Sequence, residues 1–368
     1  MCITFFYIPK NQNEKFILSF NRDEGMKKKT SILNYFEEDT NILAGRDLEG
    51  KGTWCGINKS TGIVAFLTNY DTQNYHDISD IKYGRGNLTY RFLKSEFGSC
   101  SHETINQKIY EGMNTILKEL NQYNAFNLVI GSLVTNTFYY ICNPYNQKLN
   151  ITPKPQLLEQ GKAYGLTNTD IHTLWPKTEY GLKIFNEILL KYQNNSENVN
   201  NIEQNHYVQD QSIIEDLQKL MFDQTIFNED PESESPILVK QYFSKYCKKE
   251  RGTVSSCYIV IDSKLKGIYQ ELYMQFKRNI LVSNTRLAQS VERQPFKLVV
   301  EGSSPSVGDF FTFILKERKI NFLSFLVFRN NCFKAIQLKI ISKQYPSSSV
   351  GRAPAFQAGG RGFEPLGG

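Results

Sequence analysis

Strand-like and helix-like segments follow one another in blocks along the first 277 residues, and this order limits the fold. Two apolar runs, Ile3–Ile8 and Phe16–Phe20, predict an antiparallel pair of strands, because the segment between them is rich in turn-forming residues. Further strands, then helical segments, and then strands again follow them along the chain. Such blocks favour a layered α+β domain over a doubly wound nucleotide-binding fold. The sequence also contains neither of the common glycine-rich phosphate loops.

Turn residues and apolar spacing predict the remaining elements. A second hairpin joins residues 53–57 to 63–67, because Gly62 in its connection can adopt a positive φ. Apolar residues recur every three or four positions in 102–121, which predicts a helix that packs one face on a sheet. The same reasoning predicts strands at 126–134, 137–142, 254–262 and 267–274, and helices at 180–192 and 211–221.

Two segments between these elements are polar. Residues 193–210 are rich in Asn and Gln, and residues 223–236 are acidic and contain proline. Segments with so little apolar content cannot bury enough surface to fold, so both are predicted to be disordered insertions. The domain that contains them is expected to span residues 1–277.

The net charge of +6 lies in the C-terminal quarter of the chain. Residues 1–277 hold 30 Lys and Arg against 32 Asp and Glu, whereas residues 278–368 hold 13 against 5. A basic tail can contact nucleic acid or an anionic surface. However, the stretches 286–305 and 349–365 resemble conceptual translations of transfer-RNA genes. We therefore interpret residues 278–368 as a gene-model artefact, with a real appendage as the alternative, and expect no nucleic-acid partner.

Cysteines, histidines and apolar runs exclude several classes of protein. The seven cysteines are odd in number, no two have CxxC spacing, and none lies at zinc-ligand distance from a histidine. This pattern favours a reducing compartment, and we expect no metal and no cofactor. The first apolar run stops at Pro9, and no run approaches about 18 residues. An intracellular protein without a signal peptide or membrane span is expected.

A series of short motifs carries a resemblance to a known family. Cys2 is followed by the tetrapeptide Asn21-Arg22-Asp23-Glu24. Further blocks are Ala44–Asp47, Gly52–Asn58, Leu67–Tyr70, Gly84–Leu88, Phe126–Leu128, Tyr164–Asn168, Trp175–Lys177 and Gly252–Thr253. In this order they resemble the NRDE family, also called the transport and Golgi organisation protein two family. The resemblance implies a four-layer αββα sandwich like that of N-terminal-nucleophile hydrolases.

Cys2 is the candidate nucleophile. If Met1 is removed, the free α-amine (reference pKa about 7.7 to 8.0) can act as the general base for the thiol (about 8.5). Arg22 could hold the thiolate, and Asp23 could bind the α-ammonium. The alternative interpretation makes Cys2 a small residue of a core strand and makes Arg22 and Asp23 a structural ion pair.

Two asparagines and a second arginine complete the candidate site. Asn69 and Asn168 stand in Thr-Asn contexts, where a side-chain amide can donate to a developing oxyanion, although both are also ordinary turn residues. The contexts of Asn168 and Cys257 resemble those of cysteine amidohydrolases that act on conjugated bile acids and penicillin V. This resemblance makes Arg251 a further candidate.

Three functions are compatible with these residues. The family resemblance implies a cytoplasmic, Golgi-associated or mitochondrial protein that supports secretion and Golgi organisation. Such a protein would handle haem or acyl-lipid metabolites, as a small-molecule ligand, in a cleft around Cys2, although the sequence has no axial-ligand motif for haem. The first alternative is a cysteine N-terminal-nucleophile amidohydrolase or thioesterase that uses Cys2. The second is a non-catalytic structural partner protein.

Overall fold

The fold is known from a computed structural model, which describes residues 2–70, 83–94, 102–144, 153–196, 204–227, 236–244, 248–275, 280–288, 322–329 and 332–339. The chain divides into two compact units, residues 1–295 and 296–368. The first unit contains two antiparallel sheets and four helices, so the predicted α+β class is confirmed.

The first sheet contains the strand that carries the tetrapeptide. Its strand order is β10-β1-β2-β12-β13-β14, and the short β11 pairs with β12. The strands are β1 (Ile3–Ile8), β2 (Phe16–Gly25), β10 (Lys162–Leu166), β11 (Tyr242–Ser244), β12 (Lys249–Ile261), β13 (Gly267–Gln275) and β14 (Ile280–Ala288). The predicted antiparallel pairing of β1 with β2 is confirmed, with Phe5 opposite Ser19. Because β2 continues to Gly25, all four residues of the tetrapeptide lie on a strand.

The second sheet follows the chain order β3-β4-β5-β6-β7-β8-β9. Its strands are β3 (Thr30–Tyr35), β4 (Ile42–Asp47), β5 (Cys55–Asn58), β6 (Ile63–Asn69), β7 (Phe126–Ser132), β8 (Thr137–Asn143) and β9 (Gln156–Leu157). The second predicted hairpin is confirmed as β5 and β6, and Gly62 in its turn has a φ of 70°. A left-handed conformation of this kind is one that glycine adopts without steric cost.

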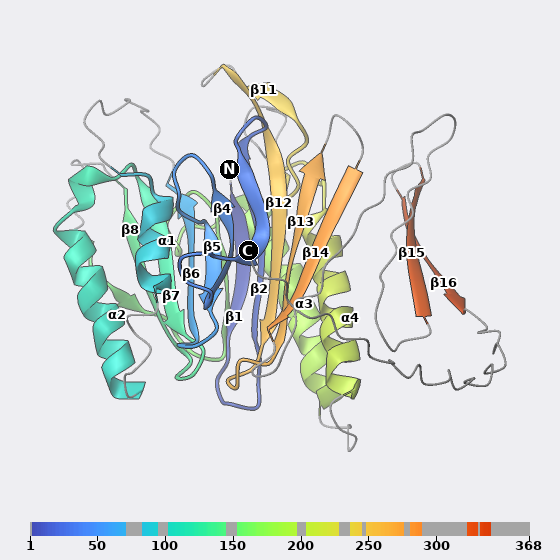
Figure 1. Ribbon diagram of the computed structural model, residues 1–368, viewed down its shortest axis with the longest axis horizontal. Helices are drawn as coiled ribbons and strands as arrows, with labels where there is room; N and C mark the ends of the chain where they lie inside the picture. The colour runs from blue at the N-terminus through green and yellow to red at the C-terminus, as the bar shows by residue number, and fades with distance from the viewer. Residues whose placement is uncertain are drawn as a thin grey trace, which may run out of the picture. The chain divides into compact units, whose positions relative to one another are not determined.

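Helices cover the outer face of each sheet (Figure 1). They are α1 (Gly86–Leu93), α2 (His102–Leu117), α3 (Pro176–Ser196) and α4 (Gln204–Met221). Ile109 and Met113 of α2 belong to the apolar cluster beneath the second sheet. Phe185 of α3 and Leu217 of α4 belong to the cluster beneath the first. A third cluster fills the space between the sheets, so the layers run helices, sheet, sheet, helices.

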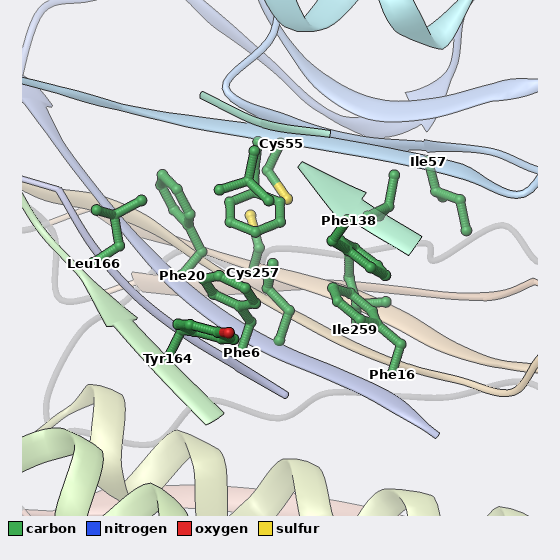
Figure 2. Close-up of a cluster of buried hydrophobic side chains, with 14 of the residues drawn as sticks. Phe6, Phe16, Phe20, Cys55, Ile57, Phe138, Tyr164, Leu166, Cys257 and Ile259 are labelled. Atoms are coloured by element: carbon green, nitrogen blue, oxygen red, sulfur yellow. The ribbon is translucent and has the colours of Figure 1, made fainter. Parts of the chain in front are cut away.

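Aromatic side chains fill much of the space between the two sheets (Figure 2). Phe16 of β2 stacks on Phe138 of β8 with ring centroids 5.0 Å apart. The rings of Phe6 (β1) and Phe66 (β6) pack edge to face, with their centroids 4.9 Å apart. Each buried ring stabilises the fold by about 1.5 to 3 kcal/mol, and ring size limits how closely the sheets approach.

The prediction of disorder in residues 193–210 is partly wrong. The helix α3 continues to Ser196 and α4 begins at Gln204, so both ends of this segment are helical. Polar residues can extend a helix beyond its apolar face when tertiary contacts hold its end. In α4 such a contact is the ion pair between Lys15 Nζ and Asp210 Oδ1, which are 2.5 Å apart. Residues 197–203, and residues 228–235 of the second polar segment, lie outside the described residues.

Strands are also found after residue 277. The strand β14 pairs with β13 from Ile280 to Ala288. In the second unit, β15 (Phe322–Arg329) and β16 (Cys332–Lys339) form an antiparallel hairpin. The interpretation of residues 278–368 as an artefact stays a prediction. Within the described ranges, no helix is both long and apolar enough to cross a membrane.

Candidate functional site

A cleft of about 320 Å³ brings residues of both sheets to the side chain of Cys2. The first sheet contributes Arg22, Asp23 and Glu24 from β2. The second sheet contributes Leu67 and Asn69 from β6, and Trp54 precedes β5. This volume lies at the lower end of the range for small-molecule sites.

Cys2 is fixed directly before β1. Its carbonyl accepts a hydrogen bond from Thr167 Oγ1 at 3.0 Å, and its Sγ donates to the carbonyl of Asp23 at 3.8 Å. The side chain is only 7% exposed, although it lines the cleft. Burial, followed by the charge of Asp23, raises the pKa of the Cys2 thiol. A thiolate at this position therefore needs nearby positive charge.

Within the tetrapeptide, Asn21 has a structural role. Its Nδ2 donates to the carbonyls of Met221 at 2.8 Å and Ile237 at 3.0 Å. Its Oδ1 accepts from Ser256 Oγ at 2.6 Å. Because Met221 ends α4, these bonds attach the end of that helix to β2.

Arg22 forms a rigid cationic wall of the cleft. Its guanidinium carbon lies 3.8 Å from the centroid of the Trp54 ring, a cation–π contact. Its Nη1 donates to Thr30 Oγ1 at 2.8 Å. The side chain is buried, so its orientation is set before a ligand arrives.

Glu271 lies next to Arg22 and was not predicted. This residue of β13 is fully buried, and it accepts hydrogen bonds from Tyr273 Oη and, at 3.3 Å, from Cys257 Sγ. Burial raises the pKa of its carboxyl to about 7, although these donors and the charge of Arg22 act in the opposite direction. A Cβ on Gly45 would lie 2.8 Å from Glu271 Oε2, so a glycine leaves room for the carboxyl.

Asp23 is held by the neighbouring strand β12. Its Oδ1 accepts from Thr253 Oγ1 at 2.6 Å. The pairing of β2 with β12 shifts register between Thr253 and Ser255, an irregularity of the kind that redirects side chains near sites. Arg251 Nη2 donates to the carbonyl of Asp23 at 3.3 Å. Arg251 thus contacts the backbone beside the site and does not line the cleft.

The two candidate asparagines differ in position. Asn69 lines the cleft, whereas Asn168 is buried beside it and follows Thr167, which bonds to Cys2. In the part of the chain that the structure describes, Asn168 Oδ1 accepts no hydrogen bond. Asn127 Nδ2 donates to the carbonyls of Thr167 at 3.1 Å and Thr169 at 2.9 Å, which fixes the segment that carries Asn168.

Lys177 is the second residue of the site that was not predicted. It lies in the first turn of α3, and only 2% of it is exposed. Burial lowers the pKa of its ammonium to about 8, and the charges of Asp23 and Cys2 oppose that shift. Nothing in the sequence marks this lysine as buried, so only the motif Trp175–Lys177 that contains it could have drawn attention to it.

Neither a metal cluster nor a disulfide is found within the described ranges. No three or more His, Cys, Asp or Glu side chains there are placed to hold a metal ion. Cys2, Cys55, Cys142 and Cys257 are free, and two of them, Cys55 and Cys257, lie in the core between the sheets (Figure 2).

Comparison with known proteins matches the chain to one family. Residues 1–275 match the family model described as Transport and Golgi organisation 2. The chain is 34% identical over 200 residues to the Transport and Golgi organization protein 2 homolog of Homo sapiens, which covers 52% of this chain and 66% of that protein. For the Mus musculus homolog the identity is 32% over 194 residues (51% and 64%), and for the Drosophila melanogaster protein 28% over 203 residues (51% and 65%). The chain therefore spans slightly less than two thirds of the length of these relatives.

Proposed function

Because the chain belongs to the Transport and Golgi organisation 2 family, we propose that it supports secretion and Golgi organisation by binding a small molecule in the cleft around Cys2. The names of the relatives support the role in transport and Golgi organisation, and the cleft supports the binding of a small molecule. The observation that carries the proposal is one small cleft lined by a thiol, a fixed guanidinium and an amide. We place this function in residues 1–277, inside the cell, with Golgi or mitochondrial association.

Acyl compounds fit the chemistry of the cleft better than haem. Arg22 can bind a carboxylate or phosphate, and Asn69 can donate to a carbonyl oxygen. Trp54 and Leu67 offer apolar surface to a short chain. No histidine is present among the described residues that line the cleft, although histidine is the axial ligand in many haem proteins.

A second candidate function is hydrolysis of an amide or thioester by Cys2. It is supported by the burial of Cys2 beside Asp23 and Lys177, an arrangement of charges that simple packing does not require. The layer order of helices, sheet, sheet, helices also agrees with the architecture of N-terminal-nucleophile hydrolases. In this mechanism Met1 is absent, and the α-amine of Cys2 is the general base.

The covalent step would proceed as an acyl transfer to sulfur. Cys2 Sγ bonds to the carbonyl carbon while its proton passes to the α-amine. Asn69 and Asn168 would donate to the oxyanion, and the leaving amine or thiol takes the proton from the α-ammonium. Water then hydrolyses the acyl-Cys2 thioester, which releases the acid and restores the thiol.

Intact-protein mass spectrometry after expression in a eukaryotic host tests the second candidate directly. Loss of Met1 is expected, and retention of Met1 rules out the N-terminal-nucleophile mechanism. The protein is then incubated with S-phenyl thioacetate. Hydrolysis requires acetylation of Cys2 before the other cysteines, and Cys2→Ser should abolish it.

Ligand binding is tested by thermal unfolding in the presence of short-chain acyl compounds. Binding without turnover predicts stabilisation that Cys2→Ala leaves intact and that Arg22→Met removes. Equal acetylation of all accessible cysteines, with no stabilisation by any compound, would favour the non-catalytic structural partner.

A further inference from the structure

Asn127 is a polar residue at a buried position of a largely apolar strand. It stands in β7 between Phe126 and Leu128, and its side chain is fully buried. Side chains alternate along a strand, so Asn127 shares the inner face of the second sheet with Val129, which belongs to the apolar cluster between the sheets. A buried amide without hydrogen bonds would destabilise the fold. The partners of Asn127 therefore decide what an asparagine does at this position.

The amide of Asn127 contacts segments of both sheets. Its Nδ2 faces four acceptor oxygens, which are Thr68 Oγ1 at 3.1 Å and the carbonyls of Asn69 at 3.3 Å, Thr167 at 3.1 Å and Thr169 at 2.9 Å. Thr68 and Asn69 belong to β6 of the second sheet, whereas Thr167 directly follows β10 of the first. An amide group has two N–H donors, which these oxygens share. One side chain therefore bridges the two sheets.

The orientation of this amide is fixed by its other end. Asn127 Oδ1 accepts a hydrogen bond from Tyr140 Oη of β8 at 2.7 Å, and Tyr140 Oη accepts one from the amide of Ile171 at 3.2 Å. A rotated amide would turn Oδ1 toward three carbonyl oxygens, which cannot donate to it. The neighbours of Asn127 therefore select the bridging orientation.

The carbonyls that Asn127 holds belong to residues on both sides of the cleft. Thr167 Oγ1 donates to the carbonyl of Cys2 at 3.0 Å, and Thr68 Oγ1 donates to the carbonyl of Thr167 at 2.5 Å. Cys2 and Asn69 both line the cleft. Hydrogen bonds thus run from Cys2 to Asn127 through Thr167. A further bond continues from Asn127 to the carbonyl of Asn69.

We infer that Asn127 is a positioning residue that sets the separation between the Cys2 thiol and the Asn69 amide, so that one carbonyl group of a ligand can meet both. A carbonyl carbon that bonds to the thiol needs a donor at its oxygen, and a displaced amide would lose that hydrogen bond. The inference rests on the proposed action of Cys2 on acyl compounds, and it specifies that the carbonyl oxygen of such a compound faces Asn69.

Two reagents that react differently with Cys2 test the inference without turnover. S-phenyl thioacetate transfers its acetyl group to the thiol through an oxyanion and releases thiophenol, which takes the thiol proton. Iodoacetamide alkylates the thiol at its CH2 carbon, releases iodide and a proton, and forms no oxyanion. Peptide mass spectrometry of the full chain gives both rates at Cys2, and the ratio of acetylation to alkylation is the readout.

In Asn127→Ala this ratio should fall about tenfold, the size expected for one lost hydrogen bond. Asn69→Ala should lower the ratio by a similar factor, and the double variant should lower it no further, because Asn127 acts through Asn69. A ratio in Asn127→Ala equal to that of the wild type would overturn the inference.

A matched control removes another fully buried asparagine. Asn58 of β5 donates through Nδ2 to the carbonyl of Leu93 at 2.8 Å, but it does not line the cleft. Asn58→Ala should lower the melting temperature as Asn127→Ala does, yet leave the ratio of the two rates unchanged. An equal fall of the ratio in Asn58→Ala would show that general loosening of the fold causes it, which contradicts the inference.

A milder variant covers the case in which Asn127→Ala does not fold. Tyr140→Phe keeps the buried ring and removes the hydroxyl that donates to Asn127 Oδ1. The amide can then rotate away from the carbonyls, so the ratio should fall by about threefold. An unchanged ratio in Tyr140→Phe would then count against the inference.

Failure of the inference can be distinguished from failure of the proposed function. A protein that releases no acetate and is stabilised by no acyl compound, but whose ratio depends on Asn127, rejects the proposed function and supports the role of Asn127. Hydrolysis or stabilisation with a ratio that is independent of Asn127 gives the opposite result. Alkylation of Cys2 without any acetylation in the wild type would reject both.

Discussion

Most residues of β2 are buried, but its first half is largely apolar, whereas its second half carries the charged residues Arg22 and Asp23. In the first half, Phe16 stacks on Phe138 between the sheets, and both apolar rings gain by leaving water. In the second half, Arg22 and Asp23 are equally buried but charged. Burial of these groups is tolerated because each has fixed partners: the Trp54 ring and Thr30 contact Arg22, and Thr253 donates to Asp23. The comparison teaches that one half stabilises the fold, whereas the other uses that stability to hold charged groups beside Cys2.

The largest expected effect is in the aromatic half. Phe16→Ala should lower the free energy of unfolding by about 3 to 5 kcal/mol, because it removes a buried ring and leaves a cavity between the sheets. Denaturation with guanidinium chloride measures this change. As a control, Phe243 is 61% exposed, and Phe243→Ala should cost less than about 0.5 kcal/mol. Similar losses of unfolding free energy in Phe16→Ala and Phe243→Ala would contradict the claim that the aromatic half of β2 stabilises the fold.

The next largest effect concerns Glu271 and depends on pH. Its pKa is about 7 in the folded protein and 4.5 ordinarily, so between these values the folded protein keeps a proton that the unfolded chain has lost. The free energy of unfolding therefore falls as pH rises through this window, by about 3 kcal/mol from this group alone. Glu271→Gln should lack this contribution.

Denaturation at pH 4.5, 6 and 7 measures the contribution of Glu271. The difference in stability between the wild type and Glu271→Gln should change steadily over this range, because all other carboxyl groups are common to both proteins. A difference that stays constant with pH would show that the carboxyl is ionised in the fold.

Asn21 should have an intermediate effect, although it belongs to the tetrapeptide. Asn21→Ala leaves the carbonyls of Met221 and Ile237 without this donor and should cost about 2 kcal/mol. Glu24 is partly exposed, and its Oε1 lies 3.6 Å from Arg251 Nη1. Glu24→Ala should therefore lower the free energy of unfolding by less than about 1 kcal/mol. Denaturation measures the loss of unfolding free energy in each variant. A larger loss in Glu24→Ala than in Asn21→Ala would contradict the structural role of Asn21.

The smallest effect on stability is expected at Cys2. Cys2→Ser exchanges a thiol for a hydroxyl that can make the same hydrogen bond to the carbonyl of Asp23, so it should cost about 1 kcal/mol or less. Acylation at this position should nevertheless be lost. Denaturation and thioester labelling measure the two properties separately. A loss of several kcal/mol would instead support Cys2 as a packing residue.

Sequence patterns predicted those elements that bury a continuous apolar face. The strands β1, β5 and β6 and the helix α2 were predicted for this reason. The strand β3 has a weak pattern, because Leu33 is buried while Ile32 is 48% exposed. The polar ends of α3 and α4 were not predicted because contacts such as Lys15 with Asp210 join residues far apart in the chain.

The candidate site was predicted in part. The structure brings Cys2, Arg22, Asp23 and Asn69 into one cleft, and their roles stay predictions. Asn168 and Arg251 lie beside that cleft. Lys177 and Glu271 could not be predicted, because a buried charge is recognised only when its surroundings are known. In the sequence each is an ordinary charged residue of a helix or strand.

The origin of the cleft walls in two different sheets has a consequence for how such a protein can diverge. Cys2 and Arg22 belong to one sheet, whereas Leu67 and Asn69 belong to the other. Substitutions at Leu67 can change which ligand fits while the strands that hold the thiol keep their hydrogen bonds. The apolar wall can therefore change its shape while the strands that hold Cys2 and Arg22 stay as they are.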